Sequence, residues 1–291
     1  MSDNLQDKQI FSEISYGFES VAIKQKKNIC KSRLDAVLES EVIKGVKLQV
    51  PLIAANMSTV TNSDFCIKLN QLGALGILHR AATNDYIIDE VKKVAAKCDW
   101  VAASIGVEDS QFEFSKELIK AGANIITIDI AHGYSDILFD LGKKIKKYST
   151  DTKVIVGNTT NTDMLLECYD WADAIKIGIA QGMACETKNT AGCTEKQFSA
   201  ILKFKQLSKK YGIPVISDGG IREPADVVKS IAAGANSIMA GSIFAACPES
   251  AAEIETKYNH DGSIASQHKI YAGMASLSSL VVNSDTHLSI D

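Results

Sequence analysis

The sequence predicts a single (β/α)₈ barrel whose active site lies on the loops at the carboxyl ends of its strands. Eight short apolar runs recur along the 291-residue chain, and segments with helical spacing separate them. Continuous apolar runs alternating with helices indicate parallel strands covered on the outside. Eight such units favour a closed barrel over an open sheet, and the chain length suits a barrel of roughly 250 residues.

The predicted strands, in chain order, are 52–55, 74–78, 100–104, 124–129, 153–157, 173–177, 213–217 and 237–240. Between them, apolar residues recur at helical intervals, for example Ile87, Val91 and Val94. The turns before three of the strands contain a glycine suited to a helix C-cap, at Gly73, Gly122 and Gly234.

The whole chain, residues 1–291, is predicted to be one barrel domain. About the first fifty residues form an N-terminal extension that is expected to pack on the barrel, and residues 277–291 form a short C-terminal tail. The connection after the sixth predicted strand is unusually long, and its excess is the stretch 178–196, rich in Gly, Thr and Ala. An enlarged loop at the catalytic face of a barrel is a candidate for function.

Composition excludes several classes of protein. The net charge is −4, so the chain has no general attraction for nucleic acid or an anionic membrane. No apolar run approaches the ~20 residues needed to cross a bilayer. The seven cysteines are odd in number and form no CxxC pair, and no apolar targeting segment opens the chain, which predicts reduced thiols and a cytoplasmic protein.

Cys185 is the candidate nucleophile, because it lies among small residues in the long loop. Thr187, two residues on, could hold or relay a proton. The alternatives are an inert buried cysteine and a threonine that bonds the local backbone.

Two glycine motifs directly follow the last two strands. They are Asp218-Gly219-Gly220 and Gly241-Ser242. Barrels build phosphate sites from backbone N–H groups at these positions, where glycine lets the backbone approach an anion closely. The Asp218 carboxylate would suit a pair of ribose hydroxyls.

Other polar residues are expected at the same mouth, because they end a predicted strand or lie within one: His79, Arg80, Asp129, His132, Asn158 and Lys176. A lysine inside a strand, such as Lys176, needs a partner or an anionic ligand to stay charged. A lone histidine such as His132 is more often a structural donor than an acid–base group. The sequence shows no zinc-type His/Cys cluster.

A series of motifs carries a family resemblance. They are PLIAANM at 51–57, IDIAHGYS at 128–135, VIVGN at 154–158, the C-x-T-K stretch around Cys185, SDGGIR at 217–222, MAGSIFA at 239–245 and YAGM at 271–274. By these the chain resembles the IMP dehydrogenase/GMP reductase family from about residue 15 to 276. Lys31-Ser32-Arg33, the AANM sequence and the C-x-T-K form resemble the reductase branch more closely. The connection after the second strand has no room for the regulatory CBS pair of most IMP dehydrogenases.

The resemblance implies NADPH-dependent reductive deamination of a purine nucleotide, GMP to IMP or a close analogue, in a homo-oligomer, expected to be a tetramer. Cys185 would form a covalent intermediate, and Thr187 would assist the departure of ammonia. The nucleotide would contact Met57, Asp218, Gly219, Gly220, Gly241, Ser242, Gly273, Met274 and Ala275. NADPH would contact Ser32, Arg33, Arg80, Asp129, Ile130, Ala131, Ile179 and Ala180, and a K⁺ ion could lie near Ala180, Gly182 and Cys185.

Two other functions stay open at this point: an IMP dehydrogenase, and a purine-nucleotide-binding relative without catalysis. Met183 stands where the family has a polar residue facing phosphate, and Glu186 adds a negative charge beside Cys185. Only fifteen residues follow Ser276, and they show neither the Arg/Tyr pair nor the Glu that the family flap carries. A dehydrogenase needs a base to activate water, whereas a reductase needs only one proton donor or acceptor for the leaving ammonia, so we expect a reductase-type cycle. An altered purine substrate also remains open.

Overall fold

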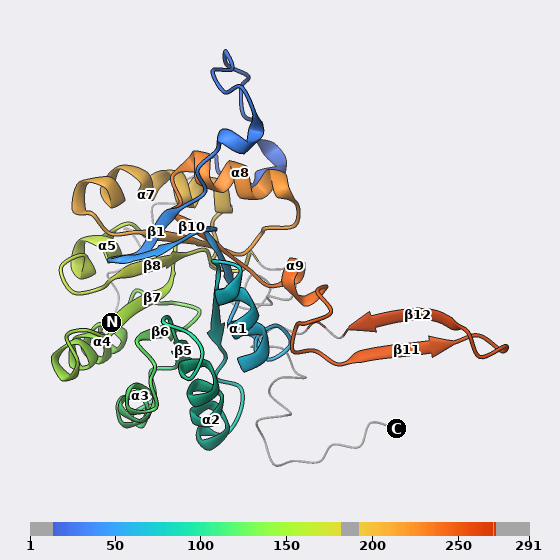
Figure 1. The fold of residues 1–291 in the computed structure, drawn as a ribbon. Helices are drawn as coiled ribbons and strands as arrows, with labels where there is room; N and C mark the ends of the chain where they lie inside the picture. The colour runs from blue at the N-terminus through green and yellow to red at the C-terminus, as the bar shows by residue number, and fades with distance from the viewer. Residues whose placement is uncertain (1–13, 182–191, 270, 272–291) are drawn as a thin grey trace, which may run out of the picture.

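In the computed structural model, which describes residues 14–181, 192–269 and 271, the chain forms a closed barrel of eight parallel strands surrounded by helices (Figure 1). The order around the barrel is β10-β3-β4-β5-β6-β7-β8-β9, and β10 pairs with both β3 and β9. The predicted (β/α)₈ fold is confirmed. The barrel strands are β3 (Leu52–Ala54), β4 (Leu75–Leu78), β5 (Ala102–Ile105), β6 (Ile125–Asp129), β7 (Lys153–Thr159), β8 (Ala174–Ile177), β9 (Val215–Asp218) and β10 (Ser237–Ala240).

The helices form the outer layer. Their bounds are α1 (Ser63–Gln71), α2 (Asn84–Ala95), α3 (Gln111–Lys120), α4 (Asp136–Tyr148), α5 (Asp163–Cys168), α7 (Gln197–Tyr211), α8 (Pro224–Ala233) and the short α9 (Ser242–Ala245). Every residue of β4, β5, β8 and β10 is buried, because helices cover the outside of these strands and side chains fill the inside. None of the helices described is long and apolar enough to span a bilayer.

A hairpin seals the amino-terminal end of the barrel. Its strands β1 (Ser40–Ile43) and β2 (Val46–Leu48) place Val42, Ile43 and Val46 in one apolar cluster with the barrel interior. The Lys44 N–H donates to the Asp173 carbonyl at 2.9 Å, just before β8 begins. Because the hairpin fills this end, the opposite end, where the strands finish, is the expected place for a ligand site.

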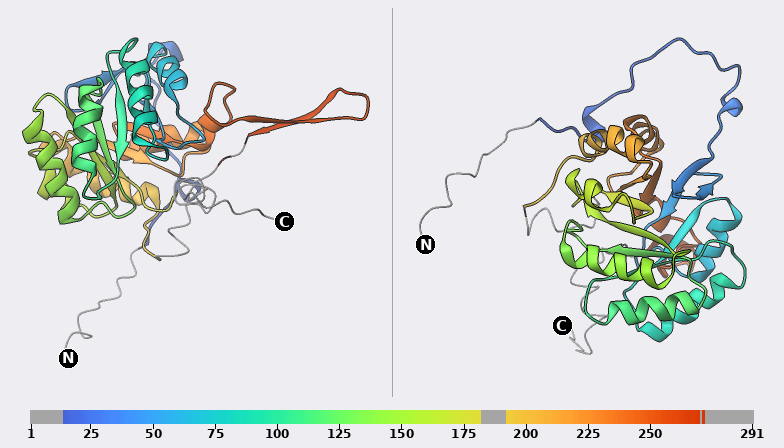
Figure 2. Two further views of the ribbon diagram at one scale, coloured as in Figure 1. Left: turned by 90° about the horizontal axis from the view of Figure 1, so that it is seen from below. Right: turned by 90° about the vertical axis from the view of Figure 1, so that its left-hand side faces the viewer.

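The rest of the N-terminal extension divides into two parts. Residues 14–20, including the 3₁₀ turn η1 (Phe18–Ser20), lie against α7 and α8, where Phe18 packs edge-on against Phe198 and Lys229 donates to the Phe18 carbonyl. Residues 22–39 are all exposed and arch away from the barrel beyond α8 (Figure 2). We call residues 22–39 the arm. The expected packing of the extension on the barrel is therefore wrong for the arm, where even apolar side chains such as Ile29, Leu34 and Val37 are exposed.

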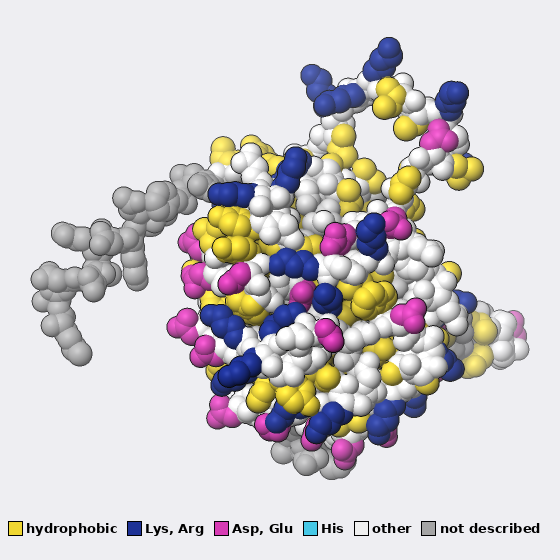
Figure 3. All heavy atoms as spheres, turned by 60° about the vertical axis from the view of Figure 1, so that its left-hand side comes forward, with side chains coloured by type: hydrophobic (Ala, Val, Ile, Leu, Met, Phe, Trp, Pro, Cys, Tyr) yellow, Lys and Arg dark blue, Asp and Glu magenta, His cyan; other side chains and the backbone are white. Residues whose placement is uncertain are grey.

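The arm carries a local 3₁₀ turn, η2 (Arg33–Asp35), closed by a capping box between Ser32 and Asp35. Lysine and arginine side chains lie along the arm (Figure 3). Lys24, Lys26, Lys27, Lys31 and Arg33 are all exposed there.

A second hairpin projects from the other side of the molecule. Its strands β11 (Ile254–Tyr258) and β12 (Ile264–Lys269) pair antiparallel and extend well beyond the barrel (Figures 1 and 2). Nothing in the sequence analysis predicted it.

Candidate active site at the barrel mouth

Four strands deliver polar side chains to one place at the carboxyl end of the barrel. Lys176 of β8 lies between two carboxylates: its Nζ is 2.7 Å from Asp129 Oδ1 and 3.0 Å from Asp218 Oδ2. The Lys176 side chain is 1% exposed. The sequence required a partner for this lysine, and the structure supplies two.

Two amides complete the network. Asn56, which follows β3, donates to Asp129 Oδ2 at 2.7 Å. Asn158 of β7 donates to Asp218 Oδ2 at 2.9 Å and to the Gly178 carbonyl at 2.7 Å. The Asn158 Oδ1 atom is buried, and no described residue donates to it. A buried acceptor without a donor is costly, so this atom is a ready partner for a ligand N–H or O–H group.

Electrostatics keep Lys176 and Asp129 charged. Burial alone would lower the pKa of Lys176, but Asp129 and Asp218 outweigh it and hold that pKa above its ordinary value. Burial would raise the pKa of Asp129, but Lys176 and Asn56 outweigh it and lower that pKa. The Asp129 and Asp218 side chains remain 21% and 19% exposed. The ammonium group of Lys176 thus pairs with both carboxylates, and a ligand in the mouth can still reach them.

His79 and Arg80 end β4 at the same mouth. His79 is buried, and its Nδ1 accepts the Ala81 N–H at 3.1 Å. Burial lowers the pKa of His79 to about 4, so the ring is neutral at neutral pH. The neighbouring Arg80 is exposed, as are Ala131 and His132 after β6.

Glycines allow the loops after β8, β9 and β10 to come close together. Gly178 has φ +134°, and a Cβ there would lie 2.1 Å from the Asp218 carbonyl oxygen. A Cβ at Gly241 would lie 2.5 Å from Tyr271 Oη and 3.0 Å from Met57 Sδ. Gly219 and Gly220 also have positive φ, +94° and +77°. Among the predicted nucleotide contacts, the structure gathers Met57, Asp218, Gly219, Gly220, Gly241 and Ser242 at these strand ends.

The base of the long loop is fixed on both sides. Thr194 Oγ1 donates to the Ile179 carbonyl at 2.7 Å, and Gln181 Nε2 donates to the Glu195 carbonyl at 2.7 Å. Ala180 has φ +62°, a left-handed conformation that glycine adopts more easily. The predicted residues Gly182, Cys185 and Thr187 lie outside the described residues, as do Gly273, Met274 and Ala275.

Two residues that the sequence analysis missed support this site. Gln197, the first residue of α7, donates to the Ile177 carbonyl at 2.7 Å and to Ser217 Oγ at 3.2 Å, so it ties β8 to β9. Asn56 is the other. Asn56 directly follows a predicted strand and Gln197 directly follows the long loop, which is the only signal the sequence offered.

Ser32 and Arg33 do not join the other predicted cofactor contacts. They lie on the exposed arm, where Ser32 Oγ accepts the Leu34 N–H at 3.1 Å. By contrast, Asp129, Ile130, Ala131, Ile179 and Ala180 follow or end β6 and β8 at the mouth.

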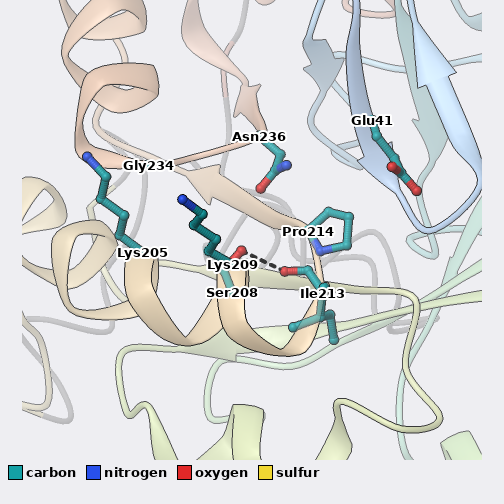
Figure 4. A pocket seen from close by; sticks show the side chains of 9 residues that line it. Glu41, Lys205, Ser208, Lys209, Ile213, Pro214, Gly234 and Asn236 are labelled. Atoms are coloured by element: carbon teal, nitrogen blue, oxygen red, sulfur yellow. Dashed lines mark hydrogen bonds between the residues drawn. The ribbon is translucent and has the colours of Figure 1, made fainter.

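A cavity of about 350 Å³ lies at the opposite, amino-terminal end of the barrel, between β1, α7 and α8 (Figure 4). Its polar groups serve the fold: Ser208 Oγ donates to the Ile213 carbonyl, and Asn236 Oδ1 accepts the Val215 N–H. The cavity is therefore not the candidate site. In the part of the chain that the structure describes, no group of three His, Cys, Asp or Glu residues could hold a metal ion.

Comparison with known proteins gives a consistent result. The IMP dehydrogenase / GMP reductase domain matches residues 15–289. A GMP reductase from Staphylococcus carnosus is 35% identical over 267 residues, covering 90% of this chain and 78% of that protein. A GMP reductase from Clostridium acetobutylicum is 33% identical over 268 residues, with 91% and 79% covered. An inosine-5'-monophosphate dehydrogenase from Cryptosporidium parvum is 31% identical over 290 residues, with 84% and 70% covered.

Proposed function

Because this chain belongs to the IMP dehydrogenase/GMP reductase family of oxidoreductases, we propose that it catalyses NADPH-dependent reductive deamination of a purine nucleotide, GMP to IMP or a close analogue. The observation that carries the proposal is the network in which Lys176 joins Asp129 to Asp218. It gives the mouth two adjacent acidic groups, one for each of two ligands that carry ribose hydroxyls.

The nucleotide contacts Met57, Asp218, Gly219, Gly220, Gly241, Ser242, Gly273, Met274 and Ala275 in this proposal. The Asp218 carboxylate accepts hydrogen bonds from the ribose hydroxyls, because an ionised carboxylate is an acceptor only. The backbone N–H groups after β9 and β10 donate to the phosphate, and the glycines there leave room for it.

The residues at the ends of β6 and β8 fit a nicotinamide dinucleotide. Asp129 and the unpartnered Asn158 Oδ1 are acceptors suited to hydroxyl and carboxamide donors. Ile130, Ala131, Ile179, Ala180 and the exposed Arg80 complete this part of the site. When bound, NADPH supplies the hydride that becomes the hydrogen on C2 of the purine. We also propose a K⁺ ion near Ala180, Gly182 and Cys185; it takes part in none of the bond changes.

The arm gives a reason to propose a homo-oligomer, a tetramer by resemblance. Ser32 and Arg33 stand away from their own barrel, so they can line a dinucleotide site only if the arm reaches another copy. A guanidinium such as that of Arg33 matches a phosphate bidentately, which would favour NADPH over NADH.

In the proposed cycle the Cys185 thiolate adds to C2 of the nucleotide and forms a C2–S bond. The bond between C2 and the exocyclic amino nitrogen then breaks, and Thr187 assists the departure of ammonia. After C2 has accepted hydride, the C2–S bond breaks and returns the thiolate of Cys185. GMP, NADPH and two protons thus give IMP, NADP⁺ and ammonium. Throughout, Lys176 holds the Asp218 carboxylate in place.

The test follows the absorbance of reduced nicotinamide with GMP and NADPH. Cys185→Ala should abolish turnover and leave nucleotide binding nearly intact. Cys193→Ala is the matched control, because Cys193 is an exposed cysteine within the same loop and should tolerate replacement. Substantial activity in Cys185→Ala would exclude covalent catalysis at this position.

An IMP dehydrogenase is the second candidate, since relatives with that name match at similar identity. Faster oxidation of IMP with NAD⁺ than deamination of GMP with NADPH would select it. Nucleotide binding with no rate in either direction, across a panel of purine nucleotides, would instead identify a binding protein without catalysis.

A further inference from the structure

Lys269, the last residue of β12, occupies a cage of neutral oxygens. Its Nζ donates to the carbonyls of Cys247 at 2.9 Å, Pro248 at 2.9 Å and Ser250 at 3.0 Å, and to Ser250 Oγ at 2.8 Å. No carboxylate is among these four acceptors. An ammonium group has three N–H bonds, so at least one of them is shared between two oxygens.

The cage is held by the barrel, independently of the lysine. Ser250 Oγ donates its single proton to the Ala245 carbonyl at 2.9 Å, so the hydroxyl presents lone pairs to Lys269. The Ser250 N–H donates to the Cys247 carbonyl, and the Ala251 N–H donates to the Val60 carbonyl. Residues 247–250 are therefore fixed to α9 and to the loop after β3, both at the mouth of the barrel.

The hairpin that carries Lys269 has little else to hold it. Among its described side chains, Ile254, Tyr258 and Ile264 are 49%, 66% and 58% exposed. An isolated two-stranded hairpin is marginally stable in water, so its direction depends on what anchors its base.

After β12 the chain returns to the candidate nucleotide site at the barrel mouth. Two residues after Lys269, Tyr271 Oη lies 3.7 Å from Met57 Sδ and close to Gly241, which has no Cβ to block it. Tyr271 thus lies at the candidate site, two residues from the caged ammonium group of Lys269.

We propose that Lys269 is a positioning residue: it fastens the base of the β11–β12 hairpin to residues 247–250 and so sets Tyr271 against Met57 at the candidate nucleotide site. The effect on nucleotide affinity rests on the proposed function, in which Met57 contacts the nucleotide. The cage itself is a preformed site for a primary ammonium group. When Lys269 is shortened to alanine, the cage binds a primary alkylammonium ion in its place.

Lys269→Ala tests the proposal, with Lys257→Ala as the control because Lys257 is an exposed lysine in the same hairpin. Amide hydrogen exchange in residues 247–269 should accelerate in Lys269→Ala and stay unchanged in Lys257→Ala. Affinity for GMP, measured by calorimetry, should fall about tenfold, the size of one charge-assisted hydrogen bond. If Lys269→Ala does not fold, Lys269→Met keeps the stem and still removes the donors.

Chemical rescue separates the cage from a general loss of packing. The n-propylammonium ion restores the atoms that the alanine variant lacks, so it should restore slow exchange and GMP affinity in Lys269→Ala. Tetramethylammonium has the same charge but no N–H donor and should restore neither.

The outcomes are distinguishable. Unchanged amide hydrogen exchange in Lys269→Ala, or no rescue by n-propylammonium, would contradict the claim that the cage holds the hairpin through an ammonium group. Faster exchange with unchanged GMP affinity would overturn the positioning role. If the wild-type chain binds no purine nucleotide, the proposed function fails, while exchange and its rescue still decide whether Lys269 fastens the hairpin.

Discussion

Replacing Lys176 with methionine should destabilise the protein more than any other single change at the mouth. Methionine keeps an unbranched stem of similar length and removes the ammonium group. The side chain is 1% exposed and contacts Asp129 Oδ1 at 2.7 Å and Asp218 Oδ2 at 3.0 Å. The substitution therefore deletes two charge-assisted hydrogen bonds and leaves two carboxylates without their cation.

The expected loss follows from these contacts. Each hydrogen bond to a charged group contributes about 1.5–3 kcal/mol. The carboxylates keep their bonds from Asn56 and Asn158 and are each about one-fifth exposed to water, which favours the lower half of that range. We expect Lys176→Met to lower the free energy of unfolding at pH 7 by about 3–4 kcal/mol, within the range for breaking a buried ion pair.

The effect should depend on pH in a defined direction. The pKa of Asp129 is lowered in the folded protein, so the stabilisation from its ionised form is present above the unfolded pKa of ~3.9 and is lost as pH falls through the folded value. The pKa of Lys176 is raised, so its contribution is complete below the unfolded value of ~10.4. The difference between wild type and Lys176→Met should therefore be full at pH 7 and should shrink in acid, as Asp129 becomes protonated.

Urea unfolding followed by the fluorescence of Trp100 and Trp171 measures this difference. The control is the triple variant Lys176→Met with Asp129→Asn and Asp218→Asn, which removes the unpaired charges and should recover part of the loss. A loss below about 1 kcal/mol for Lys176→Met, or no recovery in the triple variant, would refute the reasoning that the lysine compensates two buried carboxylates.

The remaining predictions concern the same barrel. Asp218→Ala should weaken nucleotide binding by about 1–3 kcal/mol, and an unchanged dissociation constant in calorimetry would mean that the ligand binds elsewhere. Gly178→Ala should destabilise the fold by more than Gly212→Ala in thermal melts, because both have positive φ but only at Gly178 does a Cβ meet the Asp218 carbonyl; equal effects would count against that close approach. Because the pKa of His79 falls from 6.5 to about 4 on folding, stability should fall as pH drops through this interval; His79→Gln should flatten the dependence, and an unaltered slope would contradict it. Light scattering should give a mass well above 31.4 kDa, and a monomer mass at micromolar concentration would refute the proposed oligomer.

The barrel could be predicted from sequence because strands buried on both faces need continuous apolar runs. Each of the eight runs became a strand with ends within two residues of the prediction. The β11–β12 hairpin could not be predicted in the same way. Strand β12 is Ile-Ala-Ser-Gln-His-Lys, which offers no alternating apolar face, and the hairpin packs against no core that would require one.

The site was predictable to the extent that topology alone brings residues together. Asp129, Asn158, Lys176 and Asp218 lie in or at the ends of parallel strands, which must meet at one end of a barrel. The location of Arg33 was not predictable. The family resemblance implies that Arg33 contacts NADPH, but it does not say whether that NADPH site belongs to the same barrel or to another copy of the chain.

Closure of the barrel has a consequence for how this protein is made. The strand β10 that closes the ring is the last of the eight, and its Ile238 pairs with Leu52 of the first. At ~5–20 residues per second, the ribosome needs roughly ten seconds or longer to reach β10 after β3 has emerged. For that time the nascent sheet has an unpaired edge at β3, the kind of surface on which chains associate with one another. Slower translation at low temperature lengthens this interval, and a chaperone bound to the open edge of β3 would protect that edge. Recovery of soluble protein should therefore depend on chaperone supply more than on the stability of the finished barrel.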